Sequence, residues 1–373
     1  MVNETRLLNE FLELVQIDSE SGKERQIADV LITKLKNLNL DVFEDDTTKI
    51  TNHEAGNLFA YIEGTEKNAP TIMFNSHMDT VKPGKGVKPI VKDGFITSDG
   101  TTILGADNKA GIAAILEAIR VLKEQNIKHG PIQIIFSSGE ESALAGVRAM
   151  DKTHIKADFG YAFDTVKPVG EANTSAPARG VITAEVFGKK AHAGVAPEAG
   201  VSAILIASCA VAKMPLGRID FETTANIGTF KADGSLNVVN DHVLMVAEVR
   251  SIDNEKFQNQ MDVMVKALED TALELGGKVN IKAEAKYPAF KQELNTQVVD
   301  VAKRAASRIG RNFVGAPGGG GSDANIFNGY GLPTIVLGVG YKDNHTTKER
   351  IAVEELNKMV EMAVAIAIEA AKE

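Results

Sequence analysis

The hydrophobic positions in the first third of the chain switch repeatedly between a helical and a strand-like pattern. Apolar residues recur at helical spacing in residues 7–15 and 27–35, and again from Asn108 to about Glu124. Short apolar runs that are typical of strands lie between them, at residues 58–63 (LFAYIE), 71–76 (TIMFNS) and 132–138 (IQIIFSS). Strands separated by helices indicate an α/β sheet with helices on both faces. Residues 21–24 (SGKE) are expected to form a capping box before the second helix.

The pattern changes near Pro177 and keeps its new form up to Pro288. In this stretch strand-like and helical runs follow one another in the order β-α-β-β-α-β, which is the order of a ferredoxin-like sandwich. The six runs are residues 180–188, 199–213, 223–230, 242–251, 254–275 and 278–285. We therefore predict an inserted α+β domain of residues 177–287.

After Pro288 the α/β pattern returns, with a helix at residues 294–309, a buried strand at 334–339 and a terminal helix at 352–371. A chain of 373 residues is long for a single core, because domains usually contain roughly 100 to 200 residues. The first domain would then be discontinuous. We expect it to comprise residues 1–176 and 288–373, with a mixed central sheet flanked by helices.

Composition limits the possible partners. Hydrophobic residues make up 44% of the chain and charged residues 24%, which is typical of a folded globular protein. The net charge of −9 argues against a nucleic-acid partner, because phosphate binding requires clustered Lys and Arg. No apolar window approaches the roughly 20 residues of a membrane span, and the first residues do not resemble a signal peptide. We expect a cytoplasmic protein that acts on small substrates, with neither nucleic acid nor membrane as a partner.

The chain contains one cysteine, Cys209, in the apolar run LIASCAVA, where we expect a buried helical position. No intramolecular disulfide is possible, so any metal site must use His and carboxylate ligands. Seven histidines are present. Four of them, His53, His129, His154 and His242, lie in turns or polar stretches and are expected to be solvated.

A histidine and an aspartate follow the predicted strand TIMFNS directly. Ligands bind at the carboxyl ends of strands in open α/β sheets, so His77 and Asp79 have a functional location. Residues two apart on an extended chain share a face, and one of the pair can bind a metal while the other orients it. The alternative is that His77 is a structural histidine with its hydrogen bonds satisfied.

Acidic residues occur at similar places elsewhere. Asp107 precedes a helix, where its alternative role is an N-cap. Glu140 and Glu141 follow the strand IQIIFSS, and adjacent carboxylates repel each other unless a cation or proton separates them, although a solvated turn remains possible. Asp164 ends the strand FGYAF, and His345 follows the strand TIVLGV. Metal-competent residues thus recur at five places on one presumed sheet edge, and mixed imidazole and carboxylate ligands suit zinc, or less selectively manganese or cobalt.

The ordered motifs SHMDTV, GADNKAG, SSGEES, AFDT and HTTKE resemble those of the M20 metallopeptidases, and within them the peptidase T-like (tripeptide aminopeptidase) branch. The resemblance covers nearly the whole chain, including the insert. It implies one zinc ion bound by His77, Asp107 and Asp164 and a second bound by Asp107, Glu141 and His345. It also implies that Asp79 orients His77 and that Glu140 is the general base for a metal-bridged hydroxide.

The same resemblance implies that the insert is a lid and a surface for homodimerisation. His192, in the loop KAHAG, would stabilise the oxyanion of the tetrahedral intermediate, and a structural loop histidine is the alternative. Arg250 would bind a substrate carboxylate through its planar guanidinium. Asn226 would make a similar polar contact, or else a structural hydrogen bond. The run Gly318–Gly321 resembles the family's glycine-rich segment near the active site.

The expected activity is removal of the amino-terminal residue from short peptides, tripeptides in particular. The alternative within the family is an N-acyl-amino-acid deacylase, since the same metal core cleaves many amide bonds. The alternative from another class is a metal-free binding protein that kept the fold. A serine nucleophile is disfavoured, because the chain has no G-x-S-x-G motif.

Overall fold

The computed structural model describes residues 2–373 and divides into two compact units. The large unit comprises Met1–Ser175, Gln292–Gly318 and Ser322–Glu373. The small unit comprises Ala176–Lys291 and Gly319–Gly321. The segments of the large unit come from both sides of the small one in the sequence, so the chain leaves the large unit and returns to it.

The large unit is built on a mixed sheet with the order β1-β2-β6-β3-β7-β16-β8 and β15 beside β8. A ninth strand, β14, follows β8 in the sheet order, and its residues belong to the small unit. In that order the strands are Asp41–Glu44, Leu58–Ile62, Ile132–Ser137, Ile72–His77, Phe159–Thr165, Thr334–Gly338, Glu171–Ala176 and Phe290–Lys291, with β15 at Val314–Pro317. The four central strands, β6, β3, β7 and β16, are parallel. Their carboxyl ends therefore lie along one edge of the sheet.

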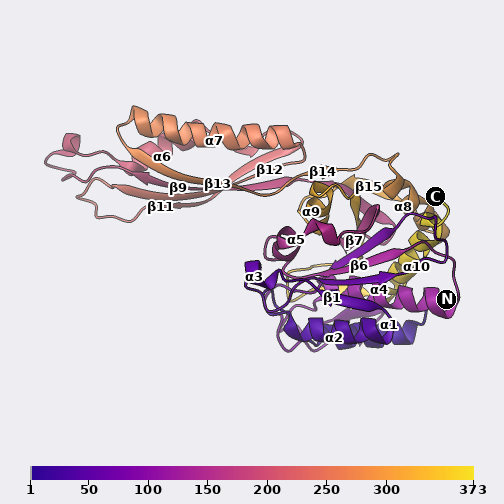
Figure 1. The fold of residues 1–373 in the computed structure, drawn as a ribbon. Coiled ribbons are helices and arrows are strands. Elements are labelled where there is room, and N and C mark those ends of the chain that lie inside the picture. The colour runs from indigo at the N-terminus through magenta and orange to yellow at the C-terminus, as the bar shows by residue number, and fades with distance from the viewer. Residues whose placement is uncertain (1) are drawn as a thin grey trace. The chain divides into compact units, whose positions relative to one another are not determined.

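Helices cover both faces of this sheet. The longer ones are α1 (Glu4–Val15), α2 (Arg25–Asn37), α4 (Ala106–Glu124), α8 (Gln297–Arg308) and α10 (Val353–Ala370). The shorter ones are α3 (Thr48–Thr51), α5 (Ala145–Ala149), η1 (Lys152–His154) and α9 (Asp323–Gly329). Figure 1 shows α1 and α4 on one side of β6 and β7, with α5 and α9 on the other. A separate three-stranded sheet contains β17 (Arg350–Ala352), β5 (Phe95–Thr97) and β4 (Ile90–Lys92).

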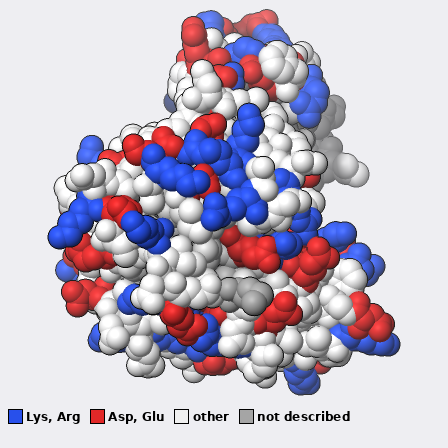
Figure 2. Space-filling view, turned by 90° about the vertical axis from the view of Figure 1, so that its right-hand side faces the viewer, with Lys and Arg blue, Asp and Glu red and all other residues white. Residues whose placement is uncertain are grey.

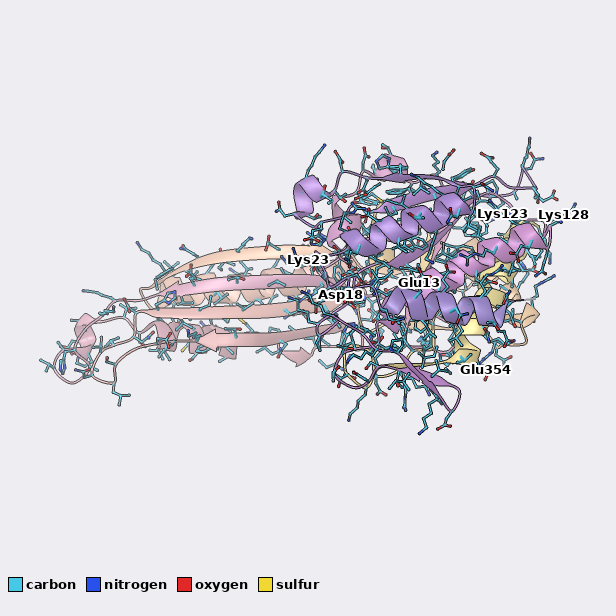
Figure 3. All side chains as sticks on the ribbon, turned by 90° about the horizontal axis from the view of Figure 1, so that it is seen from below. Glu13, Asp18, Lys23, Lys123, Lys128 and Glu354 are labelled. Carbon is cyan, nitrogen blue, oxygen red and sulfur yellow. The ribbon has the colours of Figure 1, made fainter. Side chains whose placement is uncertain are left out.

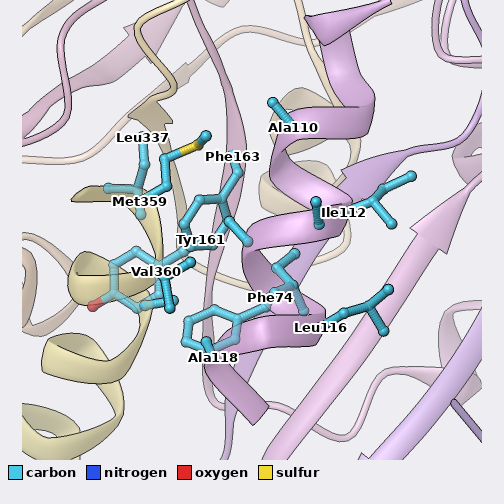
Figure 4. Close-up of a cluster of buried hydrophobic side chains, with 14 of the residues drawn as sticks. Phe74, Ala110, Ile112, Leu116, Ala118, Tyr161, Phe163, Leu337, Met359 and Val360 are labelled. Atoms are coloured by element: carbon cyan, nitrogen blue, oxygen red, sulfur yellow. The ribbon is translucent and has the colours of Figure 1, made fainter. Parts of the chain in front are cut away.

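The core of the large unit lies between the sheet and the long helices. Phe74 from β3 and Tyr161 from β7 are fully buried against Leu116 of α4 and Val360 of α10 (Figure 4). Buried residues occur all around α4, which is sandwiched between the sheet and α1 and α10. Burial of this kind stabilises a large apolar side chain by about 1.5–3 kcal/mol, so α4 is held firmly where its amino end meets the strand ends.

The small unit has a five-stranded antiparallel sheet in the order β10-β11-β12-β9-β13. Its strands are Gly217–Arg218, Thr223–Lys231, His242–Ser251, Ala178–Phe187 and Lys278–Tyr287. Helices α6 (Ala203–Ala212) and α7 (Asn254–Glu274), with the short η2 (Pro197–Ala199), complete the unit. Figure 1 shows α6 and α7 on one face of this sheet. The expected β-α-β-β-α-β order is present, with the two-residue β10 added, and the α/β and ferredoxin-like α+β fold class is confirmed.

Alternation along β12 explains why the helices lie on one face only. Val243, Met245, Ala247 and Val249 are buried toward α6 and α7, and the residues between them are half-buried. A strand with one buried face alternates in this way, because successive side chains point to opposite sides. Cys209 lies on α6 as predicted but is half-buried rather than buried.

Two local predictions were wrong. Glu24 is the N-cap residue of α2 and makes no side-chain cap, so residues 21–24 do not form a capping box. Ser21 instead donates a hydrogen bond to Asp79, 58 residues away in the sequence. The expected solvation fails for His129, which is 5% exposed with Nδ1 2.7 Å from the carbonyl oxygen of Gly130, and for His53, whose side chain is 13% exposed. Local sequence patterns identify the segment, but contacts with residues distant in the sequence determine the hydrogen-bond partners and the burial of these side chains.

Basic and acidic side chains are intermingled on the surface that Figure 2 shows. Ion pairs link α8 and α10: Arg308 lies 3.2 Å from Glu369, and Arg304 lies 3.4 Å from the same carboxylate. Arg311, after α8, lies 2.7 Å from Glu355. Among residues 2–373, no helix combines the length and the apolar character that crossing a membrane requires.

Candidate active site

The parallel strands of the large unit bring most of the predicted site residues to one edge. His77 ends β3 and Asp79 follows it, Glu140 and Glu141 follow β6, and Asp164 is the last residue but one of β7. Neighbouring parallel strands end side by side, so residues far apart in the sequence meet at this edge. The strands themselves are buried along their whole length in β3 and β6, which fixes the positions from which these side chains extend.

Asp107 enters the site from the start of α4 and lies between two histidines. Its Oδ1 is 3.1 Å from Nε2 of His77, and its Oδ2 is 3.2 Å from Nε2 of His345. Asn344 donates a hydrogen bond to the same Oδ2 at 2.8 Å. The backbone of Asp107 is not helical (φ −82°, ψ 96°), and the N-cap of α4 is Gly105. Asp107 is therefore not an N-cap, and its two oxygens face different imidazoles.

Two more carboxylates complete the groups around these imidazoles. Glu141 places Oε1 2.7 Å from Nε2 of His345. Asp164 places Oδ1 3.6 Å from Nε2 of His77 and accepts a hydrogen bond from Asn108 at 3.2 Å. The side chains thus form two overlapping groups that share Asp107.

Asp79 lies behind His77 and holds the turn after β6. It is fully buried, and its Oδ1 is 3.4 Å from Nδ1 of His77. Its carboxylate accepts hydrogen bonds from the backbone N–H groups of Glu140 at 2.9 Å and Glu141 at 3.1 Å. Ser21 Oγ donates a third at 2.7 Å, from the α1–α2 loop that also carries Asp18 and Lys23 (Figure 3). Nδ1 of His77 lies closer still, at 2.9 Å, to the backbone carbonyl oxygen of Asp79. Asp79 therefore orients the imidazole through its backbone and its carboxylate, and the carboxylate also fixes the two glutamates.

The crowding of charges shifts the pKa values of these groups. Burial alone would lower the pKa of His77, but its contacts with Asp107, Asp164 and Asp79 outweigh burial and raise it well above the usual value. Hydrogen bonds to Asp107 and Glu141 raise the pKa of His345 to about 10. Burial and the negative charge of Asp164 raise the pKa of Glu140 well above its usual range.

These residues fit divalent cations. Five carboxylates and two imidazoles share the space, so negative charge exceeds positive charge even when both imidazoles are protonated. His77, Asp107 and Glu141 offer ligand atoms that lie within 4.8 Å of one another. Imidazole nitrogen and carboxylate oxygen are suitable ligands for zinc. A cation here would relieve the repulsion between the carboxylates.

The remaining predicted residues lie in the small unit. Asn226 on β11 and Arg250 on β12 belong to the sheet face opposite the helices, because their neighbours Ala225 and Val249 are buried toward α6 and α7. Arg250 Nε donates to Glu248 at 2.6 Å, and Glu248 also accepts from Arg179. Asn226 is exposed. His192, on a loop, is also exposed, and its Nδ1 accepts a hydrogen bond from the N–H of Gly194 at 3.2 Å.

Several polar residues near the site were not singled out from the sequence, among them Ser21, Asn344 and Asp323. Ser21 and Asn344 contact Asp79 and Asp107 directly. Asp323, at the start of α9, is 1% exposed and accepts a hydrogen bond from Ser137 at the end of β6. Each lies inside or next to a segment that the sequence analysis quoted. Their positions in or near these motifs could have indicated a role at the site, but the sequence did not show which residue each of them contacts.

Residues 73–369 match peptidase family M20/M25/M40. Protein YqjE of Bacillus subtilis (strain 168) is 54% identical over 372 residues, covering 100% of both chains. The crystal structure of aminopeptidase PepT from Bacillus cereus ATCC 10987 superimposes with a TM-score of 0.97 at 54% identity, covering 99% of both chains. That of a tripeptidase from Staphylococcus aureus subsp. aureus mu50 gives a TM-score of 0.95 at 46% identity, covering 100% of both.

The fold and the cluster of imidazoles and carboxylates define a hydrolase of the peptidase class. The chain belongs to peptidase family M20/M25/M40. The resemblance to the peptidase T-like branch is confirmed, because the similar solved structures are an aminopeptidase named PepT and a tripeptidase.

Proposed function

We propose that this protein is a two-metal aminopeptidase that removes the amino-terminal residue from short peptides, tripeptides in particular. The observation that carries the proposal is the position of Asp107, with one carboxylate oxygen toward His77 and the other toward His345. A carboxylate placed in this way can serve two cations at once. The names of the aminopeptidase and the tripeptidase with similar structures support the choice of substrate.

Two zinc ions would be held by overlapping ligand sets, with cobalt or manganese as substitutes. His77, Asp107 and Asp164 would bind one, and Asp107, Glu141 and His345 the other. When bound, the cations would supply Lewis-acid chemistry, polarising the scissile carbonyl and lowering the pKa of the attacking water. Asp79 would keep His77 in the orientation that presents Nε2 to the cation, since its carboxylate lies on the Nδ1 side of the ring.

Glu140 is proposed as the general base. Its backbone is fixed by Asp79, the residue is 8% exposed, and burial together with the nearby charge of Asp164 raises its pKa. A raised pKa lets a carboxylate accept a proton from the attacking water and then donate it to the leaving amine. One side chain would therefore carry out both proton transfers, from the attacking water and to the leaving amine.

The small unit is proposed to act as the lid and to bind the substrate. His192 would donate to the oxyanion of the tetrahedral intermediate, Arg250 would bind the terminal carboxylate of the peptide, and Asn226 would add a polar contact. We also propose that the small unit forms a homodimer interface, because α6 exposes the apolar side chains of Ile204 and Leu205.

Hydrolysis of a Leu-Gly-Gly-type tripeptide, with chromatography of the products, tests the function. We expect release of the amino-terminal residue, loss of activity after chelation, and recovery with zinc, cobalt or manganese. N-acetyl and N-succinyl amino acids are assayed in parallel. Turnover of the acylated substrates alone would reject the aminopeptidase function in favour of a deacylase, and a protein that binds no metal and cleaves neither would reject catalysis altogether.

A further inference from the structure

Glu349 is a buried carboxylate next to the site that the proposed chemistry does not use. It is 1% exposed and lies four residues after His345, in the motif HTTKE. Its Oε2 accepts hydrogen bonds from the backbone N–H groups of Leu104 and Gly105, both at 2.8 Å. Its Oε1 accepts from the N–H of Asp107 at 2.9 Å. One side chain therefore holds three backbone groups that are more than 240 residues away in the sequence.

The segment that Glu349 holds has little regular structure of its own. Gly105 has a φ of +78°, and Asp107 has backbone angles outside the helical region. The first N–H groups of a helix have no partners within the helix, and α4 lacks a side-chain cap at Gly105. The carboxylate of Glu349 supplies acceptors from another part of the chain, at the helix end where negative charge is favourable.

We propose that Glu349 is a positioning residue that sets the bridging carboxylate of Asp107 relative to His345. Both residues are proposed to bind the same cation, and Glu349 connects the backbone of the first to the loop that carries the second. This inference rests on the proposed two-metal function. Its consequence is that metal affinity depends on a side chain that touches no metal.

The chemistry of the carboxylate explains which replacements are informative. In Glu349→Gln one oxygen becomes an NH₂ group, so a donor faces either the N–H groups of Leu104 and Gly105 or that of Asp107. A buried N–H that loses its acceptor carries a desolvation penalty, and the turn moves to avoid it. Glu349→Asp keeps the charge and both acceptors but is shorter by one methylene group, so it should have a smaller effect.

Glu355 offers a matched control. It lies six residues further on, in α10, and its carboxylate also accepts a backbone hydrogen bond, from the N–H of Val169 at 2.7 Å. Its other partner is Arg311, at 2.7 Å. Glu355→Gln thus makes the same chemical change at a similarly placed carboxylate that holds a different segment.

The test is calorimetric titration of chelator-stripped wild-type, Glu349→Gln, Glu349→Asp and Glu355→Gln protein with Zn²⁺, together with tripeptide kinetics and thermal unfolding of each metal-free protein. We expect Glu349→Gln to weaken at least one Zn²⁺ site by about 10- to 100-fold, which is typical for groups that orient metal ligands. We expect kcat to fall with KM little changed. Glu349→Asp should lie between it and the wild type, and Glu355→Gln should retain wild-type Zn²⁺ affinity.

Wild-type Zn²⁺ affinity in a folded Glu349→Gln protein would overturn the positioning role of Glu349 and leave the proposed function standing. An equal loss of Zn²⁺ affinity in Glu355→Gln would do the same. If Glu349→Gln does not fold, Glu349→Asp decides: weakened Zn²⁺ binding in the folded protein supports positioning, whereas unchanged binding overturns it. Failure of both variants to fold would assign Glu349 a purely structural role. A wild-type protein that binds no Zn²⁺ would contradict the two-metal function, and the inference with it.

Discussion

Glu140 and Glu141 are neighbours in the sequence, but their surroundings differ. Both backbone N–H groups donate to Asp79, so both residues start from the same fixed turn. Glu141 then reaches His345 at 2.7 Å, whereas Glu140 is buried close to the negative charge of Asp164, which raises its pKa. The first arrangement suits a metal ligand and the second a proton acceptor.

Glu140→Ala should keep its bound metal and lose most of kcat, because general-base catalysis contributes roughly 10²- to 10⁴-fold. Metal analysis and tripeptide kinetics on the same sample check this. Glu141→Ala is the matched variant and should lose metal as well as activity. Wild-type turnover in Glu140→Ala would remove this residue from the mechanism.

Glu24 gives a prediction about pH. It is fully buried, and burial and the negative charge of Asp79 raise its pKa to about 7. The folded protein therefore binds more protons here than the unfolded chain between about pH 4.3, the ordinary value for a glutamate, and pH 7. Stability from this group is present at low pH and is lost as pH rises through that window.

Glu24→Gln cannot titrate, so the unfolding free energy of the wild type minus that of the variant should fall between pH 4.5 and pH 7.5. The expected fall is on the order of 1–3 kcal/mol. Urea unfolding of both chelated proteins at several pH values measures it. A difference that does not depend on pH would show that Glu24 titrates normally.

At the scale of elements, the turn between β6 and α5 is packed against His53 in addition to its hydrogen bonds with Asp79. Gly139 has a φ of +63°, and a Cβ there would lie 2.2 Å from Cε1 of His53. Side chains rarely adopt this φ, and the imidazole leaves no space for one. The turn that carries Glu140 is thus packed against His53, whose side chain is 13% exposed.

Gly139→Ala should lower the unfolding free energy by about 2–4 kcal/mol, from the positive φ and the clash together, and should lower kcat because Glu140 is displaced. Gly100→Ala is the control: its φ is +86°, but nothing lies within 4 Å of the added Cβ, so about 1–2 kcal/mol is expected with normal kcat. Adding His53→Ala to Gly139→Ala should recover part of the loss. Equal effects of the two glycine substitutions would mean that His53 does not brace the turn.

The elements that were predicted well have either a regular hydrophobic period or a continuous apolar run. β12 and α7 match their predicted ranges to within a residue, because burial alternates along β12 and repeats at helical spacing along α7. β6 and α4 match to within two residues, because both are buried almost throughout. The three-stranded sheet of β17, β5 and β4 was not predicted, since each strand has three residues and is too short for a period.

In the candidate site, too, some residues could be identified from the sequence and others could not. Residues at strand ends were identified because parallel strands end together, which requires only a correct assignment of the strands. Ser21 and Glu349 were missed because each acts on a segment distant in the sequence, Ser21 through a side chain and Glu349 through backbone N–H groups. A single sequence contains no local pattern that predicts contacts between residues so far apart.

At the scale of the whole molecule, the six residues proposed for metal binding and proton transfer all lie in the large unit with Asp79, while His192, Asn226 and Arg250 lie in the small one. Each unit has its own hydrophobic core. The two connections are adjacent, because the N–H of Gln292 donates to the carbonyl oxygen of Thr174 at 2.7 Å. The small unit is therefore inserted at a point where a short link can rejoin the chain.

Replacement of residues 177–290 by a short Gly-Ser link should leave a folded protein that binds Zn²⁺ with nearly wild-type affinity but hydrolyses tripeptides very poorly. Metal titration and peptide kinetics separate the two properties. A shortened protein that cleaves tripeptides at the wild-type rate would exclude the proposed roles of His192 and Arg250. A shortened protein that does not fold would mean that the large unit depends on the small one.

Cys209 offers an attachment point for measuring the spacing of the two units by spectroscopy. It is the only cysteine in the chain and is half-buried on α6, so a thiol-reactive dye would attach to the small unit at one position. Lys128, after α4, has an 83% exposed side chain (Figure 3), so Lys128→Cys would add a second attachment point on the large unit. Energy transfer between two dyes would then report, in solution, how the spacing of the units responds when a peptide is added.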